Sequence, residues 1–445
     1  MSQAPRQMHL GVFVLGTGNH SAGWRYPGAA TRNTDLAVLQ EIARIAERGR
    51  FDLLFVADGL VMDPGDHPSF LCRFEPTTLL AVLSATTRHI GLGATVSTSF
   101  GEPYHVARTF ASLDHLSQGR AAWNVVTSSA PKAALNFSRE QHMDHALRYA
   151  VANEFVDVVK GLWDCWTDGA IVADTATGLY LDPARVRPLH HHGRFFQVKG
   201  PLNISRCPQG HPVIIQAGGS PAGLDLAART ADVVFSVVQE LDSARQAYAT
   251  LKGRLGTYGR APDQLTVLPG VMPILGRTDA EAHDKLAVLQ SWVTPTNALT
   301  LVSGRLGYDV TSFPLDAPVP APPPGAPGSQ TFPKVLFEAA RRQQMTLRDL
   351  YNVTAAARGH WVVCGTPPRI ADTLEEWFVA GAADGFNILP PYFPGAFAEF
   401  VDLVVPELQR RGLFRRTYAG ATLREHFGLA RVPSPGARRD AGGRE

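Results

Sequence analysis

The sequence contains few cysteines and no long apolar run. Its four cysteines, Cys72, Cys165, Cys207 and Cys364, are widely spaced and form no CxxC pair, which is typical of reduced thiols in a cytoplasmic protein. No apolar run reaches the roughly 18 residues that span a membrane, so we expect no transmembrane segment. Residues 1–15 lack a small-residue cleavage signal before their apolar stretch, which argues against secretion.

The sequence also lacks an excess of either charge. Lys and Arg total 42, against 40 for Asp and Glu. This balance provides no electrostatic field for nucleic acid or for an anionic membrane, so a small molecule is the expected partner. Apolar residues make up 45% of the chain and charged residues 18%, which indicates a globular protein.

Three adjacent histidines, His190–His192, are the most obvious candidates for metal ligands. Adjacent histidines in a loop cannot all bind one ion without strain, and no carboxylate lies at a ligand-like spacing. We therefore predict no metal site.

Apolar runs of strand length alternate with segments of helical spacing, such as residues 36–46 and 155–163. Because the runs are apolar throughout, both faces of the sheet should be covered. Eight such units predict a (β/α)8 barrel. An open doubly wound sheet is the alternative, but no GxGxxG follows the first run to support a dinucleotide site. The eight runs are residues 9–15, 51–58, 89–98, 120–127, 211–219, 231–237, 265–275 and 385–392.

Three segments interrupt the alternation. We expect a single barrel domain over residues 1–431, with insertions at about 165–210 and 296–360. The second insertion is too rich in Pro and Gly for regular structure, and its segment 313–333 is a candidate lid. Residues 432–445 are predicted to be a disordered tail.

Polar residues lie where several of the predicted strands end. In a barrel the carboxyl ends of the strands meet at one mouth, so Asp58, Thr95, Asn124 and Ser128 should converge there. The fifth run ends in "QAGGSPAG", in which Gly219 allows close backbone approach and Ser220 supplies a hydroxyl. Such a loop suits an anion, but an ordinary turn with Ser220 as the helix N-cap is at least as well favoured.

Histidines supply further candidates. His145 and Tyr149 are spaced i, i+4, so they share one helix face and both donate hydrogen bonds, although a surface histidine beside a packed tyrosine has the same pattern. Asp58 could instead cap a turn, and His20 could be an ordinary loop histidine. The substrate stays open, because Arg25, Arg73 and Lys132 could receive a carboxylate but solvated surface charge is the favoured interpretation for each of them.

Several stretches together resemble the nitrilotriacetate monooxygenase family, a branch of the bacterial-luciferase superfamily that includes dibenzothiophene sulfone monooxygenase and pristinamycin IIA synthase. They include "GRAAWNVVTS", "ATVSTSFGEPYHVAR", "RYAVANEFVDVVKGLWD", "QAGGSPAGLDLAARTADVVF" and "VPELQRRGLFRRTYAGATLREHFGL", and the matches run in order from about residue 9 to residue 429. Where many relatives have histidines, this chain has Asn19 and Tyr26.

The resemblance implies a flavin-dependent monooxygenase with a (β/α)8 barrel. Such an enzyme receives FMNH2 from a separate NAD(P)H:flavin reductase and uses O2, through a flavin C4a-(hydro)peroxide, to oxygenate a small organic substrate. It also implies a cytoplasmic homodimer or homotetramer. The alternatives are a deazaflavin-dependent hydride-transfer enzyme and a non-catalytic flavin-binding barrel.

The resemblance also assigns roles to individual residues. The family's flavin positions correspond to Asp58, Thr95, His145, Tyr149 and Ser220, with Gly219 beside the phosphate, while Asn124 and Ser128 are expected as secondary contacts. A reaction of this kind requires a dry pocket and a positioned hydrogen-bond donor. His20, after the first predicted strand, is the first candidate for that donor, and His360 is the second.

Overall fold

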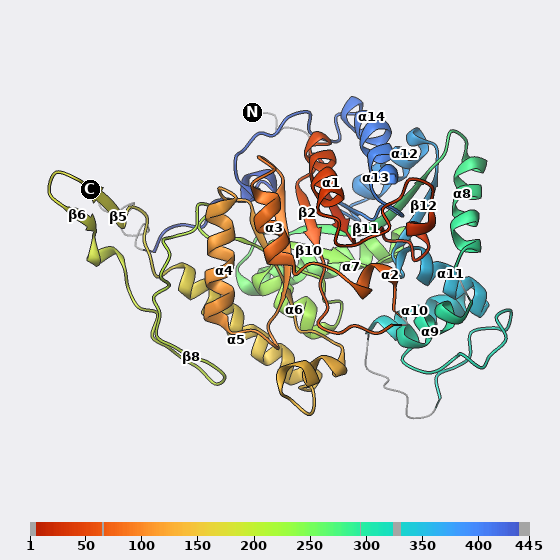
Figure 1. Cartoon of the computed structure of the whole chain (residues 1–445), viewed down its shortest axis with the longest axis horizontal. Helices are drawn as coiled ribbons and strands as arrows, with labels where there is room; N and C mark the ends of the chain where they lie inside the picture. Colours follow the sequence, from red (N-terminus) through yellow and green to blue (C-terminus); the bar gives the residue numbers. More distant parts are fainter. Residues whose placement is uncertain (1–5, 65, 294, 324–330, 436–445) are drawn as a thin grey trace.

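The computed structural model describes residues 6–64, 66–293, 295–323 and 331–435. Its centre is a closed barrel of parallel strands, surrounded by helices (Figure 1). The barrel closes because β1 pairs with β13 and β10 pairs with β11. The strands, in barrel order, are β1 (His9–Val14), β2 (Leu53–Val56), β3 (Gly91–Ser97), β4 (Ala121–Val126), β9 (Val213–Gln216), β10 (Val233–Ser236), β11 (Thr266–Leu275) and β13 (Gly385–Ile388).

Each predicted apolar run contains one barrel strand, so the (β/α)8 prediction is confirmed. A ninth parallel strand, β12 (Trp361–Gly365), was not predicted. It pairs with the carboxyl half of β11, from Val271 to Leu275, where β11 extends beyond its pairing with β10. The sequence of β12 directly follows the segment predicted to be an irregular insertion, and it was not recognised as a strand.

The barrel separates two apolar cores. Alternate residues of the strands, including Phe13, Phe55 and Phe235, fill the interior, while their neighbours pack outward against the helices. The surrounding helices are α1 (Leu36–Arg48), α2 (Pro68–Leu71), α3 (Pro76–Ser84), α4 (Pro103–Leu116), α5 (His145–Trp163), α6 (Pro221–Thr230), α7 (Leu241–Arg254), α8 (Asp279–Ser291), α12 (Pro367–Val379), α13 (Gly395–Glu399) and α14 (Val405–Arg410). Among them, α1 and α5 contain the two segments whose spacing predicted helices.

The amino-terminal end of the barrel is closed by the carboxyl-terminal part of the chain. Leu423, in α15 (Leu423–His426), and the following Phe427 and Leu429 belong to the interior core. A Cβ on Gly91, the first residue of β3, would overlap the Leu423 side chain. The barrel interior is therefore accessible from the carboxyl ends of its strands rather than from this end.

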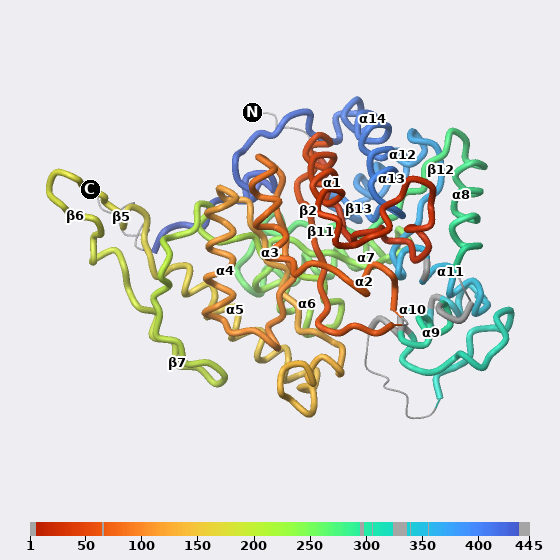
Figure 2. Tube along the Cα trace, in the orientation of Figure 1, coloured from red at the N-terminus to blue at the C-terminus, as the bar shows by residue number. Residues whose placement is uncertain are grey.

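The first insertion consists of two small antiparallel hairpins. One pairs β5 (Ile171–Asp174) with β6 (Leu179–Leu181) and extends away from the barrel, as the trace in Figure 2 shows. The other pairs β7 (His191–His192) with β8 (Gln197–Val198). The Glu154 carboxylate on α5 holds the second hairpin, because it accepts hydrogen bonds from the backbone N–H groups of Phe195 and Phe196 and contacts His191 Nε2 at 3.1 Å.

The second insertion is more regular than predicted, and the expectation of irregular structure over residues 296–360 is wrong for most of it. It contains α9 (Pro295–Leu306), α10 (Thr331–Arg342) and α11 (Leu347–Ala357), which bury a small core that includes Val302, Leu336 and Leu350. The Pro-rich stretch is confined to the connection between α9 and α10, of which residues 324–330 lie outside the described residues.

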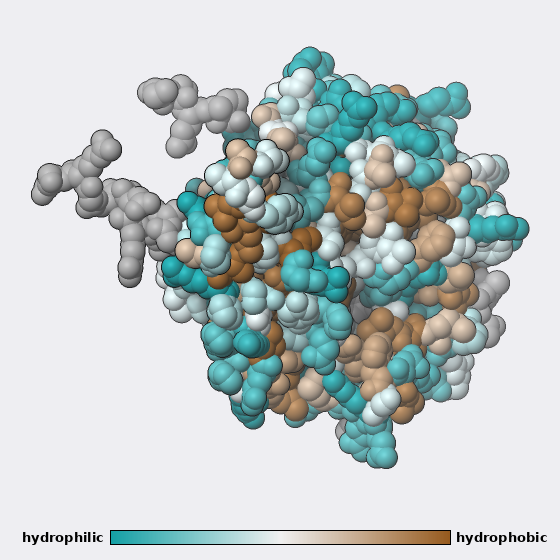
Figure 3. Space-filling model, turned by 60° about the vertical axis from the view of Figure 1, so that its left-hand side comes forward, coloured by the Kyte–Doolittle hydropathy of each residue, from teal (hydrophilic) through white to brown (hydrophobic). Residues whose placement is uncertain are grey.

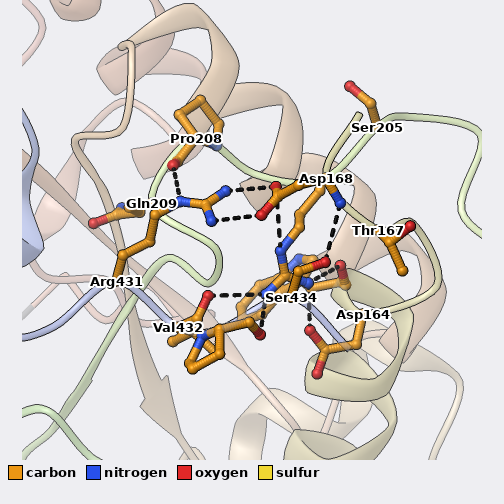
Figure 4. A network of polar contacts seen from close by, with 12 residues as sticks. Asp164, Thr167, Asp168, Ser205, Pro208, Gln209, Arg431, Val432 and Ser434 are labelled. Carbon is orange, nitrogen blue, oxygen red and sulfur yellow. Dashed lines mark hydrogen bonds and ion pairs between the residues drawn. The ribbon is translucent and has the colours of Figure 1, made fainter. Parts of the chain in front are cut away.

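The carboxyl-terminal segment is held against the first insertion at its start. Arg206 donates to the carbonyl oxygens of Val432 and Pro433 at 3.1 and 2.9 Å, and the backbone N–H of Asp168 donates to Ser434 Oγ at 3.0 Å. Arg431 makes a bidentate ion pair with Asp168 at 2.7 and 2.8 Å (Figure 4). Residues 432–434 are thus ordered, contrary to the predicted tail, and residues 436–445 lie outside the described residues.

Apolar residues are scattered on the face shown in Figure 3, and the described helices are too short or too polar to cross a bilayer. On the face shown in Figure 3, apolar residues form several separate patches among polar ones. Within the part of the chain that the structure describes, no helix combines the length and the apolar character needed to cross a bilayer. All four cysteines are free thiols.

Candidate functional site

The predicted site residues on β3 and β4 are hydrogen-bonded to each other. Asn124 Nδ2 donates to Thr95 Oγ1 at 2.9 Å, and Thr95 Oγ1 donates to the carbonyl oxygen of Val56, at the end of β2, at 3.0 Å. Both side chains are buried, and Asn124 Oδ1 has no hydrogen-bond partner among the described residues. A buried amide oxygen without a partner is costly, so this position is suited to a ligand that carries a donor.

A second pair lies one step further along the same strands. Ser128 Oγ donates to Ser97 Oγ at 2.8 Å, and Ser128 has a positive φ of 46°. Asp58, Thr95, Ser97 and Ser128 line one cavity of about 170 Å³ at the carboxyl ends of β2, β3 and β4. The structure therefore brings four of the predicted residues, Asp58, Thr95, Asn124 and Ser128, into one region of the mouth.

Asp58 is engaged with a neighbour that the sequence did not reveal. Arg73 Nε lies 3.1 Å from Asp58 Oδ1, and Arg73 Nη2 donates to Gly59 O at 2.8 Å. Burial nevertheless raises the pKa of Asp58, and the Arg73 charge offsets only part of that effect. Arg73 is a candidate for binding a substrate carboxylate, but this ion pair holds its guanidinium beside Asp58.

The other two basic residues considered for the substrate are engaged as well. Arg25 Nη1 donates to the carbonyl oxygen of Trp292 at 2.6 Å, and Lys132 Nζ lies 3.2 Å from Asp63 Oδ2. Neither contact identifies a substrate site.

His145 and Tyr149 form a second part of the mouth, on α5. Their ring centroids are 4.9 Å apart, and His145 is exposed. The Tyr149 hydroxyl lies against the turn before α6, since a Cβ on Gly218 or Gly223 would be 3.0 or 2.9 Å from its oxygen. The two glycines therefore let the tyrosine hydroxyl reach the loop that contains Gly219.

Ser220 is the N-cap of α6, as the simpler interpretation of its sequence proposed. Its Oγ accepts a hydrogen bond from Gly223 N at 3.1 Å. This bond does not use the hydroxyl hydrogen, which stays available to an acceptor. Gly219 is exposed, and apart from its chain neighbours no atom of the described residues lies within 4 Å of where its Cβ would be. The loop is thus open beside the first turn of a ten-residue helix.

His20 is a buried neutral donor. Burial lowers its pKa to about 3, so the ring is uncharged near neutral pH. His20 Nδ1 accepts the backbone N–H of Ala22 at 3.1 Å, which places the ring proton on Nε2. His20 Nε2 is buried and has no hydrogen-bond partner among the described residues. In His20, Nδ1 is therefore already hydrogen-bonded to Ala22, whereas the Nε2–H group can donate to a ligand.

His360 lies against the inner wall of β11. Leu268 and Met272 belong to the interior core, so the intervening Gly270 also faces inward. A Cβ on Gly270 would overlap the His360 ring. His20 follows β1, whereas His360 packs on β11. Because β13 lies between β1 and β11, the two histidines are associated with strands on opposite sides of β13.

Two polar residues near the site were not predicted. Asn387, on β13, is 1% exposed, its Oδ1 has no partner among the described residues, and a Cβ on Gly11 would be 3.1 Å from that atom. Arg148 precedes Tyr149 on α5 and is 8% exposed. The sequence did contain a signal for Arg148, because it lies four and seven residues before the apolar Ala152 and Phe155 and so shares their buried face.

Comparisons with known proteins agree with this geometry. Residues 8–384 match the family model described as luciferase-like monooxygenase. Over 96% of this chain and 98% of each relative, the sequence is 48% identical to N-acetyl-S-(2-succino)cysteine monooxygenase of Bacillus subtilis and 46% identical to nitrilotriacetate monooxygenase component A of Aminobacter aminovorans. It is 42% identical to dibenzothiophene-sulfone monooxygenase of Rhodococcus erythropolis, also over 96% of this chain and 98% of the relative.

Proposed function

The chain belongs to the luciferase-like monooxygenase family and is a flavin-dependent monooxygenase, and we propose that its flavin is FMN, supplied as FMNH2 by a separate NAD(P)H:flavin reductase. The family resemblance recognised in the sequence is thereby confirmed. The relatives are named for chemically different substrates, so the identity of the substrate does not follow from the likeness.

The observation that carries the proposal is the set of polar groups gathered at neighbouring strand ends. A flavin needs donors and acceptors along its ring edge and an anion site for its phosphate. Asn124 Oδ1 is a buried acceptor without a partner among the described residues, next to the cavity that contains Asp58. The open loop at Gly219, the Ser220 hydroxyl and the Tyr149 hydroxyl fit a phosphate.

The residues divide between the two ends of the cofactor. Asp58, Thr95, Asn124 and Ser128 would hold the ring and its side chain. His145, Tyr149, Gly219 and Ser220 would hold the phosphate. When bound, the reduced flavin supplies the electrons that activate O2 for transfer of one oxygen atom to the substrate.

His20 would supply the hydrogen-bond donor near the reacting oxygen. Its Nε2–H is buried and uncommitted among the described residues, and its Nδ1 is fixed by Ala22. A neutral donor of this kind does not change with pH in the physiological range, because its pKa is about 3. His360, over Gly270, is the second candidate for the same role.

The test is reconstitution with an unrelated flavin reductase, NADH, FMN and a panel of candidate substrates. The proposal expects O2 uptake that depends on FMN and a product whose mass has increased by one oxygen atom. Turnover of a deazaflavin without O2 would instead identify a hydride-transfer enzyme. FMN binding without turnover of any substrate would favour a non-catalytic barrel.

We further propose a cytoplasmic homodimer or homotetramer. The free thiols of all four cysteines support the location. The β5–β6 hairpin supports self-association, because Val172 and Tyr180 are 43% and 68% exposed on a two-stranded element that contains little core of its own. Sedimentation velocity of the full chain measures the assembly state, and a monomer across the micromolar range contradicts this part of the proposal.

A further inference from the structure

Arg148 is a buried cation in the wall of the mouth. Its residue is 8% exposed, and its Nη1 donates to the carbonyl oxygen of Ser128 at 2.8 Å and lies 3.5 Å from that of Thr127. Its Nε is buried and has no hydrogen-bond partner among the described residues. No carboxylate in the described part of the chain forms an ion pair with it, and Asp144, the acid whose charge acts on it, is an exposed N-cap.

Such a charge is expensive to bury. A guanidinium removed from water is stabilised by an anion or by a full set of acceptors, and Arg148 has only carbonyl oxygens. Burial accordingly lowers the pKa of Arg148, with its neighbours offsetting only part of that effect. Among the described residues, the arginine is therefore a buried positive charge without a carboxylate in direct contact.

Two connections relate Arg148 to the predicted phosphate loop. Tyr149, the next residue, reaches Gly218 and Gly223 at the start of α6. Arg148 instead reaches the end of β4, and β4 pairs directly with β9, the strand that leads into the glycine loop. The charge thus lies at the carboxyl end of β4, the strand next to the one that leads into the glycine loop.

The carbonyl oxygen that Arg148 contacts has a second hydrogen-bond donor. Ser128 O accepts a second hydrogen bond, from His142 Nε2 at 2.5 Å, and Ser128 has a positive φ. Since two donors share this carbonyl, removal of Arg148 leaves the oxygen paired with His142. A variant at Arg148 should therefore keep the loop and the fold.

We propose that Arg148 is the buried countercharge for the phosphate of the bound cofactor. It acts through the low-dielectric wall of the site as well as by any direct contact, and the anion supplies a counterion to a buried charge that pairs with no carboxylate of the described residues. The inference rests on the proposed function, because it concerns the same flavin site.

The experiment compares FMN with riboflavin, which has the same ring and no phosphate. Binding of each to the full chain is measured by flavin fluorescence, for the wild type and for Arg148→Met and Arg148→Lys. We expect Arg148→Met to weaken FMN binding by roughly ten- to a hundredfold, as for loss of a contact to a charged group, and to leave riboflavin binding within about twofold. Arg148→Lys should retain most of the preference for FMN.

Arg139→Met is the matched control. Arg139 also donates to a loop carbonyl at the mouth, that of Ser99 at 2.8 Å, but it is exposed. It should leave the affinity ratio of FMN to riboflavin unchanged. Circular dichroism and a melting curve without ligand establish that each variant is folded.

The outcomes separate this inference from the proposed function. If the wild type binds neither flavin, the proposed function fails. If the wild type binds both and Arg148→Met weakens both equally, Arg148 only shapes the loop and the countercharge is wrong. Unchanged binding of both ligands by Arg148→Met overturns the inference as well.

Discussion

Asn124 and Thr95 join neighbouring barrel strands through their side chains, with the amide of one donating to the hydroxyl of the other over 2.9 Å. The Thr95 hydroxyl in turn donates a hydrogen bond to Val56 O, so hydrogen bonds connect β4 through β3 to the end of β2. The orientation of the Asn124 amide is fixed by these hydrogen bonds, and its oxygen, which has no partner among the described residues, can accept a hydrogen bond from a ligand.

Thr95→Val should therefore damage stability and cofactor binding together. The substitution keeps the side-chain volume but removes the acceptor of Asn124 Nδ2 and the donor to Val56 O. We expect the free energy of unfolding to fall by about 1–3 kcal/mol, the usual cost of leaving a buried polar group unpaired. Urea denaturation measures it, and Thr109→Val, at an exposed position on α4, is the control and should change little.

Tyr149→Phe and Ser220→Ala should have different effects. Tyr149→Phe removes a hydroxyl that the proposed phosphate uses, and we expect weaker FMN binding with little loss of stability. Ser220→Ala also removes the N-cap bond to Gly223 N, so it should cost about 1 kcal/mol of folding free energy in addition. Fluorescence titration and urea denaturation measure the two effects. Full FMN affinity in the double variant would place the phosphate elsewhere.

His20→Ala should keep the fold and FMN binding but direct electrons from NADH into free H2O2 instead of product. The variant lacks the buried Nε2–H donor, and donor roles of this kind are worth roughly 10²–10⁴ in rate. The ratio of oxygenated product to H2O2 is measured at a fixed supply of reduced flavin, with His360→Ala in parallel. If only His360→Ala produces excess H2O2, the donor is His360.

The neutral state of His20 also predicts a pH dependence of stability. Its folded pKa is lowered from 6.5 to about 3, so the unfolded chain binds the extra proton between these values. Stability from this group is complete above pH 6.5 and is lost as the pH falls toward 3, at up to about 1.4 kcal/mol per pH unit. His20→Gln should lack this dependence.

That comparison must be made as a difference between wild type and variant. Burial raises the pKa of Asp114 to about 6, and its protonation on acidification has the opposite sign, because the folded state then binds the extra proton. This contribution is common to both proteins and cancels in the difference. Parallel stability curves between pH 4 and 6.5 for the two proteins would show that His20 is not buried in neutral form.

Gly270→Ala tests the position of His360. The added methyl group would overlap the imidazole, so the ring must move or β11 must shift. Overpacking of this kind costs about 1–3 kcal/mol, and we expect the same increase in H2O2 as for a His360 variant if that histidine is the donor. Gly253→Ala is the control, since nothing lies near its Cβ position in α7, and it should be neutral or stabilising.

The sequence was sufficient for the barrel because its strands are covered on both faces and therefore apolar throughout. It was insufficient for β12, whose pairing depends on β11 being longer than its neighbours. It also failed for α10, because the adjacent Pro-rich stretch concealed a helix whose apolar face packs on α9.

The site shows the same division. Polar residues at strand ends, such as Asp58 and Thr95, are visible in a pattern because the barrel topology gathers them. The pairing of Asp58 with Arg73 depends on how helices and loops pack over those ends. Patterns of one chain segment do not contain that information.

The seal at the amino-terminal end of the barrel has a consequence for biosynthesis. Leu423, Phe427 and Leu429 complete an interior layer whose other members, such as Leu53 on β2, are made hundreds of residues earlier. A nascent chain can therefore pair its strands in order, but that end of the interior stays exposed to water until residues 423–429 have been made and have packed against it. Chains that lack these residues should accordingly be recognised by proteases and chaperones as incompletely folded.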